Sequence, residues 1–241
     1  MKNILITGVS KGLGLTIAET LLQNDYIVYG LSRTKSNELD ELLQKYPKSL
    51  KWLSFDLQNI DNVRDLIFKN WIGFNTPLHG LINNAAFAYD DIFTNLNTAI
   101  LQEMYAINVF TPMNITKYAI RHMLLHKVQG SIVHLSSISV HTGYKGLSMY
   151  ASSKGALEAF SKNIAREWGA TGIRSNCLIA GFMETEMSST LSEEQKRRIY
   201  NRTSLKKATS KESVSETIAF LISEKSSSIT GQNIFVDNGT I

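Results

Sequence analysis

The sequence has few of the residues that mark secreted, disulfide-bonded or membrane proteins. Its 241 residues include a single cysteine, Cys177, so no intrachain disulfide can form, and its apolar neighbours favour a buried, inert thiol. No apolar run approaches the length of about 18 residues that a membrane span needs, and the first residues lack the architecture of a signal peptide. We therefore expect a cytoplasmic protein without membrane segments.

The excess of basic over acidic residues is also small. The chain has 25 basic and 21 acidic residues, a net charge of +4 that we take to be spread along the sequence. Such a balance does not predict a nucleic-acid partner, and the basic runs at 196–198 and 206–207 are expected to be solvated faces. No pattern suggests a metal site.

Prolines are also rare and occur only at Pro47, Pro77 and Pro112. Along the chain, apolar runs that resemble strands alternate with amphipathic segments. Their near-continuous apolarity is typical of parallel strands covered on both faces. We predict a doubly wound α/β fold, with a seven-stranded parallel sheet of Rossmann type, as one domain over residues 1–241. The expected strands are 4–6, 26–29, 50–55, 78–82, 132–135, 173–179 and 234–236.

A glycine-rich turn follows the first expected strand. It runs from Thr7 to Gly14, and helical spacing continues from Leu15 to Leu22. Glycine permits the tight turn and close approach of backbone to a phosphate, which then faces the helix N-terminus. The turn therefore predicts a dinucleotide site, made by Gly8, Ser10, Lys11, Gly12, Leu13 and Gly14.

The second expected strand leads into Arg33, where an NAD site usually has an acidic residue. A guanidinium can pair bidentately with a 2′-phosphate, and Lys11 can reach the same anion. NADP is therefore the expected cofactor, although both residues could instead be ordinary surface cations.

Tyr150 and Lys154 stand four residues apart, which places phenol and ammonium on one helix face. An adjacent cation lowers a tyrosine pKa from its usual value near 10, and this favours acid–base chemistry at neutral pH. Ser137 ends an apolar run upstream, and we expect its hydroxyl at the end of a buried strand.

These motifs resemble those of the short-chain dehydrogenase/reductase family. Its Thr-Gly-x-x-x-Gly-x-Gly pattern is found at Thr7 to Gly14, and the resemblance extends over essentially the whole chain. It implies a catalytic tetrad of Asn108, Ser137, Tyr150 and Lys154. It also implies cofactor contacts beyond the glycine turn, from Asp56, Leu57, Asn84, Ala85, Tyr150, Lys154, Met183 and Thr185. Ala86 and Ala180 depart from the usual glycine and proline.

The resemblance implies a role for each member of the tetrad. Tyr150 donates a proton to the alkoxide that forms when hydride reaches a ketone, and Ser137 binds the carbonyl oxygen. Lys154 lowers the tyrosine pKa and binds the nicotinamide ribose, while Asn108 holds a water that links Lys154 to solvent. From the residues alone, Ser136 or Ser137 could cap a turn, and Asn108 could be exposed or mark a kink. His134 is expected to be a core histidine, whereas His141 is expected near substrate.

Substrate identity is less defined by the sequence. Mostly apolar and aromatic side chains are expected around the substrate, from Phe87, Tyr89, Val140, His141, Tyr144, Phe182, Met183 and Met187. They favour an uncharged, partly hydrophobic ketone over a phosphorylated sugar, although the methionines could simply be core or lid residues.

Within the family, residues 181–195 most resemble the 3-oxoacyl-[acyl-carrier-protein] reductases of fatty acid biosynthesis. Those enzymes present basic residues to an acidic carrier, and here Val128 and Thr171 occupy the positions, with Lys127 and Arg174 as nearby substitutes. The alternatives are reduction of another ketone or a keto-sugar, and a non-catalytic protein that senses NADP. The resemblance also implies a homodimer or homotetramer.

Overall fold

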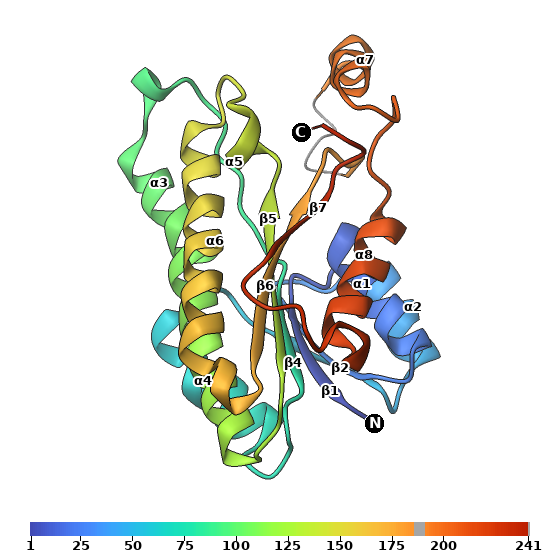
Figure 1. Cartoon of the computed structure of the whole chain (residues 1–241). Coiled ribbons are helices and arrows are strands. Elements are labelled where there is room, and N and C mark those ends of the chain that lie inside the picture. Colours follow the sequence, from blue (N-terminus) through green and yellow to red (C-terminus); the bar gives the residue numbers. More distant parts are fainter. Residues whose placement is uncertain (186–190, 241) are drawn as a thin grey trace.

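The computed structural model describes residues 1–185 and 191–240, and these form one α/β domain (Figure 1). Seven parallel strands are ordered β3-β2-β1-β4-β5-β6-β7, which confirms the predicted sheet. The strands are β1 Asn3–Thr7, β2 Ile27–Ser32, β3 Leu50–Ser54, β4 Gly80–Asn83, β5 Ser131–Ser137, β6 Arg174–Ala180 and β7 Asn233–Val236.

Two helical layers cover the sheet. The α-helices are α1 Gly12–Gln23, α2 Asn37–Lys45, α3 Thr98–Tyr105, α4 Thr111–Leu125, α5 Ser139–Thr142, α6 Ser148–Trp168, α7 Glu193–Arg202 and α8 Lys211–Ile222. Two π-helical segments, η2 Val63–Ile72 and η4 Ala106–Phe110, and four short 3₁₀ turns, η1 Ile60–Asn62, η3 Phe93–Asn95, η5 Gly169–Thr171 and η7 Glu224–Ser226, complete them. Figure 1 shows α1, α2 and α8 on one face, with α4 and α6 on the other. None of the described helices is long and apolar enough to cross a membrane.

The strand sequences explain why both faces are covered. All five residues of β1 are buried, and successive side chains point to opposite faces of a strand. Ile4 and Ile6 accordingly pack in the core under α1 and α8, whereas Leu5 packs in the second core with residues of η2 and α4. The continuous apolarity that predicted a parallel sheet follows from this double burial.

The strand order places the β1 and β4 ends side by side where the chain reverses direction across the sheet. β1 pairs with β2 on one side and with β4 on the other. In such folds a ligand binds outside the carboxyl ends of the strands at this switch point. The loops after β1 and β4 are therefore the place to look for a site.

Candidate active site

A cavity of about 720 Å³ lies at the carboxyl ends of the strands. All fifteen residues that the sequence suggested for cofactor contact line it, from Gly8 in the glycine turn to Thr185 after β6. Further lining residues that sequence reasoning did not select include Ser36, Glu38, Leu135 and Ser136. Ser137 and Asn108 do not line this cavity. The cavity therefore joins the turn after β1 to the Tyr150 helix.

The glycine turn is packed so tightly at Gly8 and Gly14 that neither position has space for a side chain. Gly8 has φ +78°, and its amide donates to the Leu31 oxygen over 2.7 Å. A Cβ on Gly14 would lie 1.9 Å from the Gly8 oxygen and 2.6 Å from the Asn84 amide nitrogen. The backbone at the N-terminus of α1 is therefore not covered by side chains of these glycines, and a phosphate site requires such access to the backbone.

Asn84 fastens the β4 loop to this turn. Its side-chain nitrogen donates to the oxygens of Thr7 and Gly8 over 3.0 and 3.2 Å. The Thr7 hydroxyl accepts in return from the backbone amides of Asn84 and Ala85 over 3.1 and 3.0 Å. The two loops that flank the switch point therefore form one rigid rim of the cavity.

Charged residues gather at the end of the cavity next to β2. Arg33, Lys11 and Glu38 all line it, together with Ser36. The Ser36 hydroxyl donates to the Ser10 oxygen over 2.5 Å and caps α2 by accepting from the Leu39 amide. Hydrogen bonds from its own backbone and from Ser36, together with the charge of Lys11, lower the pKa of Glu38. This end holds two cations and one carboxylate at neutral pH.

Tyr150 and Lys154 share one face of α6, as their spacing predicts. The Lys154 ammonium lies 5.8 Å from the centre of the Tyr150 ring and donates to the Leu135 oxygen over 2.8 Å. Burial lowers the pKa of Lys154 to about 8. The two groups that the sequence paired are therefore neighbours at the cavity.

The direction of the Tyr150 pKa shift differs from the prediction. Loss of water contacts raises the pKa of Tyr150, and the charge of Asp90 raises it further. The expected lowering by Lys154 is therefore wrong for this structure, because the cost of removing a phenolate from water is the largest effect on the Tyr150 pKa. Tyr150 consequently remains a neutral proton donor at neutral pH.

Ser137 and Ser136 point to opposite sides of β5 and have different partners. The Ser137 hydroxyl accepts from the amide and the hydroxyl of Ser139, over 3.2 and 3.0 Å. Both of these bonds use its lone pairs, so the Ser137 proton remains to be donated elsewhere. Ser136 instead donates to Glu158 over 2.6 Å. Ser139 and Glu158 were not selected from the sequence, where no motif distinguishes them.

Glu158 connects three elements around the end of β5. Its carboxylate lies 3.1 Å from His141 Nε2 on α5, and it accepts from the Asn233 side chain on β7 over 2.7 Å. The His141 ring also packs edge-on against Phe235, with centroids 5.0 Å apart. The imidazole of His141, which was expected near substrate, is thus paired with Glu158 and, like Ser137, does not line this cavity.

Asn108 lies in the π-helical segment η4 and is fully buried. Its side-chain nitrogen donates to the Phe87 oxygen and to the Ser153 hydroxyl over 2.9 and 3.0 Å, and its oxygen accepts from the Phe87 amide over 2.8 Å. Both N–H donors are occupied, so the kink interpretation fits better than an exposed asparagine. The amide joins the β4 loop to the helix of Tyr150.

His134 is a core histidine, as expected. Its Nδ1 lies 3.1 Å from the side-chain nitrogen of Asn83, and burial lowers its pKa to about 3. Phe87 and Met183 line the cavity, whereas Phe182 packs on Tyr200 with ring centroids 6.0 Å apart.

Other expected substrate contacts have local partners. The Tyr89 hydroxyl donates to the Asn95 oxygen, the Tyr144 ring faces Arg202, and Val140 packs beside Gly155 on α6. Met187 lies outside the described residues.

The two cations suggested for a carrier protein are far from this cavity. Arg174 begins β6, while Ala180 at the other end of the strand lines the cavity, so about 20 Å of extended chain separates them. The Arg174 guanidinium donates to Ser226 and to the Ser223 oxygen over 2.9 and 3.0 Å. Lys127 follows α4 at the same distant edge, before β5 begins. Neither borders the mouth of the site, which corrects that prediction.

Comparisons with known proteins agree with this geometry. A family model described as enoyl-(acyl carrier protein) reductase matches residues 8–240. The 3-oxoacyl-[acyl-carrier-protein] reductase of Chlamydia pneumoniae is 30% identical, with 99% of this chain and 96% of that protein covered. Carbonyl reductase [NADPH] 2 of Sus scrofa is 31% identical, with 98% and 94% covered.

Solved structures agree as well. ElxO with NADP bound has a TM-score of 0.88 at 28% identity, covering 99% of this chain and 98% of ElxO. The cavity, the Tyr150–Lys154 pair and a full-length match to this family of sequences lead to one conclusion. The chain belongs to the short-chain dehydrogenase/reductase family of oxidoreductases.

Proposed function

We propose that this protein is an NADPH-dependent reductase that transfers hydride to a ketone, and that its substrate is a 3-oxoacyl thioester. The observation that carries the proposal is a neutral, buried phenol beside a buried ammonium, on the wall of the cavity that begins at the bare glycine turn. The similarity to the 3-oxoacyl reductase of Chlamydia pneumoniae supports the thioester.

The residues of the cavity fit a dinucleotide phosphate. Gly14 allows Gly8 and Asn84 to pack against the start of α1, and Gly12 faces open space, with no atom within 4 Å of the position of a Cβ, so a phosphate can approach the N-terminus of α1. Gly8, Ser10, Gly12, Leu13 and Gly14 would hold the pyrophosphate by this turn. Asp56, Leu57, Asn84, Ala85, Met183 and Thr185 would contact the rest of the molecule along the cavity wall. When bound, NADPH supplies the hydride.

The other chemical steps fall to residues of the chain. Tyr150 donates its proton to the oxygen of the ketone as negative charge develops there. Ser137, whose lone pairs are used by Ser139, donates a hydrogen bond to the same oxygen and so lowers the cost of that charge. Lys154, with a pKa of about 8, stays largely protonated at neutral pH and stabilises the tyrosinate left behind.

Asn108 has a positioning role in this proposal. Its amide connects the Phe87 backbone to Ser153, whose hydroxyl donates to the backbone carbonyl oxygen of Tyr150 over 2.7 Å. The two N–H donors of Asn108 are occupied, so the water that the resemblance implied would have to donate to the remaining lone pair of its oxygen. We assign the side chain to holding the start of α6, which carries the phenol, in place relative to the β4 loop.

The proposed function is tested by NADPH oxidation over a panel of substrates. The panel contains a 3-oxoacyl thioester, its enoyl counterpart, a cyclic ketone and a keto-sugar. We expect turnover to be fastest with the 3-oxoacyl thioester. Preference for the sugar would favour the second candidate, which the similarity to L-xylulose reductase of Caenorhabditis elegans supports, at 27% identity. Binding of NADPH without any turnover would instead identify a cofactor sensor.

Cofactor choice is expected to depend on Arg33. Replacing Arg33 with alanine removes a charged donor to the 2′-phosphate, so NADPH binding should weaken by about 10- to 100-fold, while NADH binding changes little. Fluorescence titration measures both dissociation constants. Lys35→Ala is the matched control, because Lys35 pairs with Asp40 at 2.8 Å and does not line the cavity. Equal losses for the two nucleotides would exclude recognition of the 2′-phosphate by Arg33.

We also propose that the protein forms a homodimer or homotetramer. Phe110 is 51% exposed on the helix that carries Asn108, beside Tyr105 at a centroid distance of 6.3 Å. Exposed aromatic side chains on a long helix are typical of subunit contacts.

A further inference from the structure

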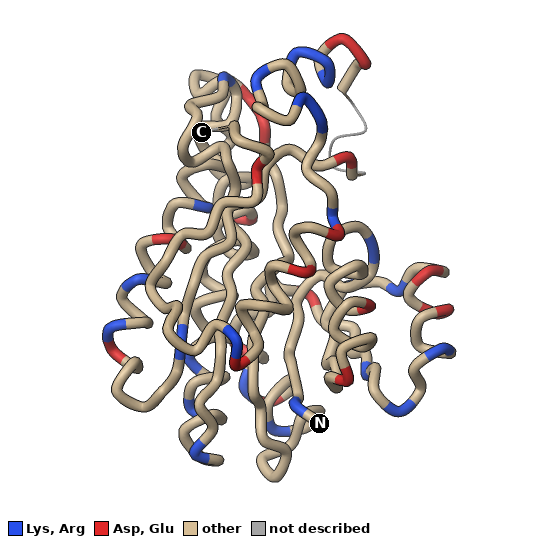
Figure 2. The backbone as a smooth tube through the Cα atoms, turned by 45° about the vertical axis from the view of Figure 1, so that its right-hand side comes forward, with Lys and Arg blue, Asp and Glu red and all other residues tan. Residues whose placement is uncertain are grey.

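The positive charge of the chain is concentrated in one segment rather than spread along the sequence. Residues 193–207, which are α7 and the five residues after it, contain six basic and two acidic side chains. Their excess of four positive charges equals the net charge of the whole chain, +4, so the remainder is neutral overall. We call this segment the basic rim. Figure 2 shows its lysines and arginines gathered at one end of the molecule.

The basic rim lies at the mouth of the candidate active site. Figure 1 shows α7 beyond the carboxyl ends of the strands, and the loops at this end of the sheet line the cavity. Contacts fix it there, because the Arg202 guanidinium lies 5.7 Å from the ring of Tyr144, in the loop between Ser137 and Tyr150. Tyr200 packs on Phe182, which follows β6 next to the cavity-lining Met183.

Part of this charge is available to a partner. Arg197, Arg202, Lys206 and Lys207 are exposed to solvent. The carboxylates of Glu193 and Glu194 are occupied by Lys196 and Arg198, over 2.7 and 2.6 Å. Among the described residues, no carboxylate pairs with Arg197 or Lys207. Leu205, two residues before Lys207, is 61% exposed and adds an apolar side chain to this segment.

We propose that the basic rim is the docking surface for an acidic carrier protein that delivers the ketone as a thioester. The inference rests on the proposed function and specifies how its substrate arrives. Charge complementarity is the argument for this occupant, since a cluster of cations steers an acidic partner and orients it at the cleft. The oxoacyl group, still attached to the carrier as a thioester, then extends from the basic rim to Tyr150.

The test compares substrates that differ only in what carries the oxoacyl group. One is attached to an acidic carrier protein, one to coenzyme A, and one to uncharged N-acetylcysteamine. The double variant Arg197→Glu/Lys207→Glu should lose about tenfold or more in kcat/KM with the carrier-bound substrate and remain within about twofold with the uncharged thioester. For the natural chain, raising salt from about 50 to 500 mM should reduce kcat/KM for the carrier-bound substrate alone.

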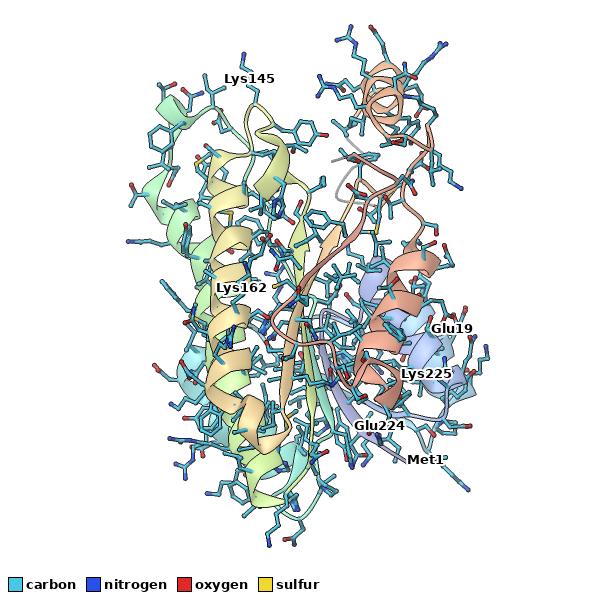
Figure 3. The ribbon with its side chains drawn as sticks, in the orientation of Figure 1. Met1, Glu19, Lys145, Lys162, Glu224 and Lys225 are labelled. Carbon is cyan, nitrogen blue, oxygen red and sulfur yellow. The ribbon has the colours of Figure 1, made fainter. Side chains whose placement is uncertain are left out.

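A matched variant controls for the change in net charge. Lys48→Glu/Lys225→Glu alters the charge equally at exposed positions away from the rim, and Figure 3 shows Lys225 far from the end of the molecule where Lys145 lies. It should leave all three rates unchanged.

Equal rates for the rim variant and the natural chain, or equal losses with all three substrates, would overturn the proposal. An equal loss with coenzyme A and carrier would mean that the rim binds phosphate rather than an acidic protein. Failure of the proposed function is distinguishable, because the natural chain would then reduce none of the three.

Discussion

Replacing Tyr150 with phenylalanine is expected to lower kcat by about 10²- to 10⁴-fold, the range that general acid catalysis contributes. The variant keeps the ring that packs on α6 but removes the only proton that the phenol can give. In the structure this proton is firmly held, because burial raises the pKa of Tyr150. Turnover of the preferred ketone, measured by NADPH oxidation, checks the prediction.

Cofactor binding separates a chemical from a structural effect of this change. Tyr150 is one of many residues along the cavity, so Tyr150→Phe should bind NADPH within about twofold of the natural chain, because little contact area is lost. Fluorescence titration measures this constant. Retained turnover would remove Tyr150 from the role of acid, whereas lost cofactor binding would mean that its hydroxyl supports the site.

Replacing Gly14 with alanine is expected to have the second large effect. The added Cβ would lie 1.9 Å from the Gly8 oxygen, which belongs to the backbone of a turn at φ +78° and cannot rotate away. The turn must open, so we expect NADPH affinity to fall more than about tenfold and the free energy of unfolding to fall by about 1–3 kcal/mol. Nucleotide titration and urea unfolding measure the two quantities.

Gly169→Ala provides the comparison for this glycine. Gly169 follows α6 with φ −57°, and a Cβ there would meet no atom within 4 Å. The substitution should leave nucleotide affinity unchanged and alter the free energy of unfolding by less than about 0.5 kcal/mol. If Gly14→Ala behaved in the same way, close packing of Gly8 on Gly14 would not be what shapes the site.

The local patterns of the sequence predicted much of the fold. Each apolar run became a strand of the seven-stranded sheet, with ends that differ by a few residues; β2, for example, spans Ile27–Ser32 where 26–29 was expected. Strand ends are set by hydrogen bonds to neighbouring strands, which a run of apolar residues does not encode. The glycine turn and the Tyr150–Lys154 spacing were predictable because each depends on only a few consecutive residues.

Contacts between distant segments were not predictable in this way. Glu158 binds Ser136, His141 and Asn233, which come from three different elements, and no spacing in the sequence connects them. The partners of Asn108 depend similarly on how the loop after β4 meets η4.

The sequence by itself determined the order of strands and helices, the bare phosphate-sized turn and the phenol and ammonium on one helix face, because backbone preference and short-range periodicity fix these features. Only the tertiary structure decided the direction in which the Tyr150 pKa shifts, the pairing of His141 with Glu158 and the placement of the cations of α7 at the mouth of the cavity. The physical reason is that burial and electrostatic interactions sum over atoms from every element that packs around a group, and folding alone brings those elements together.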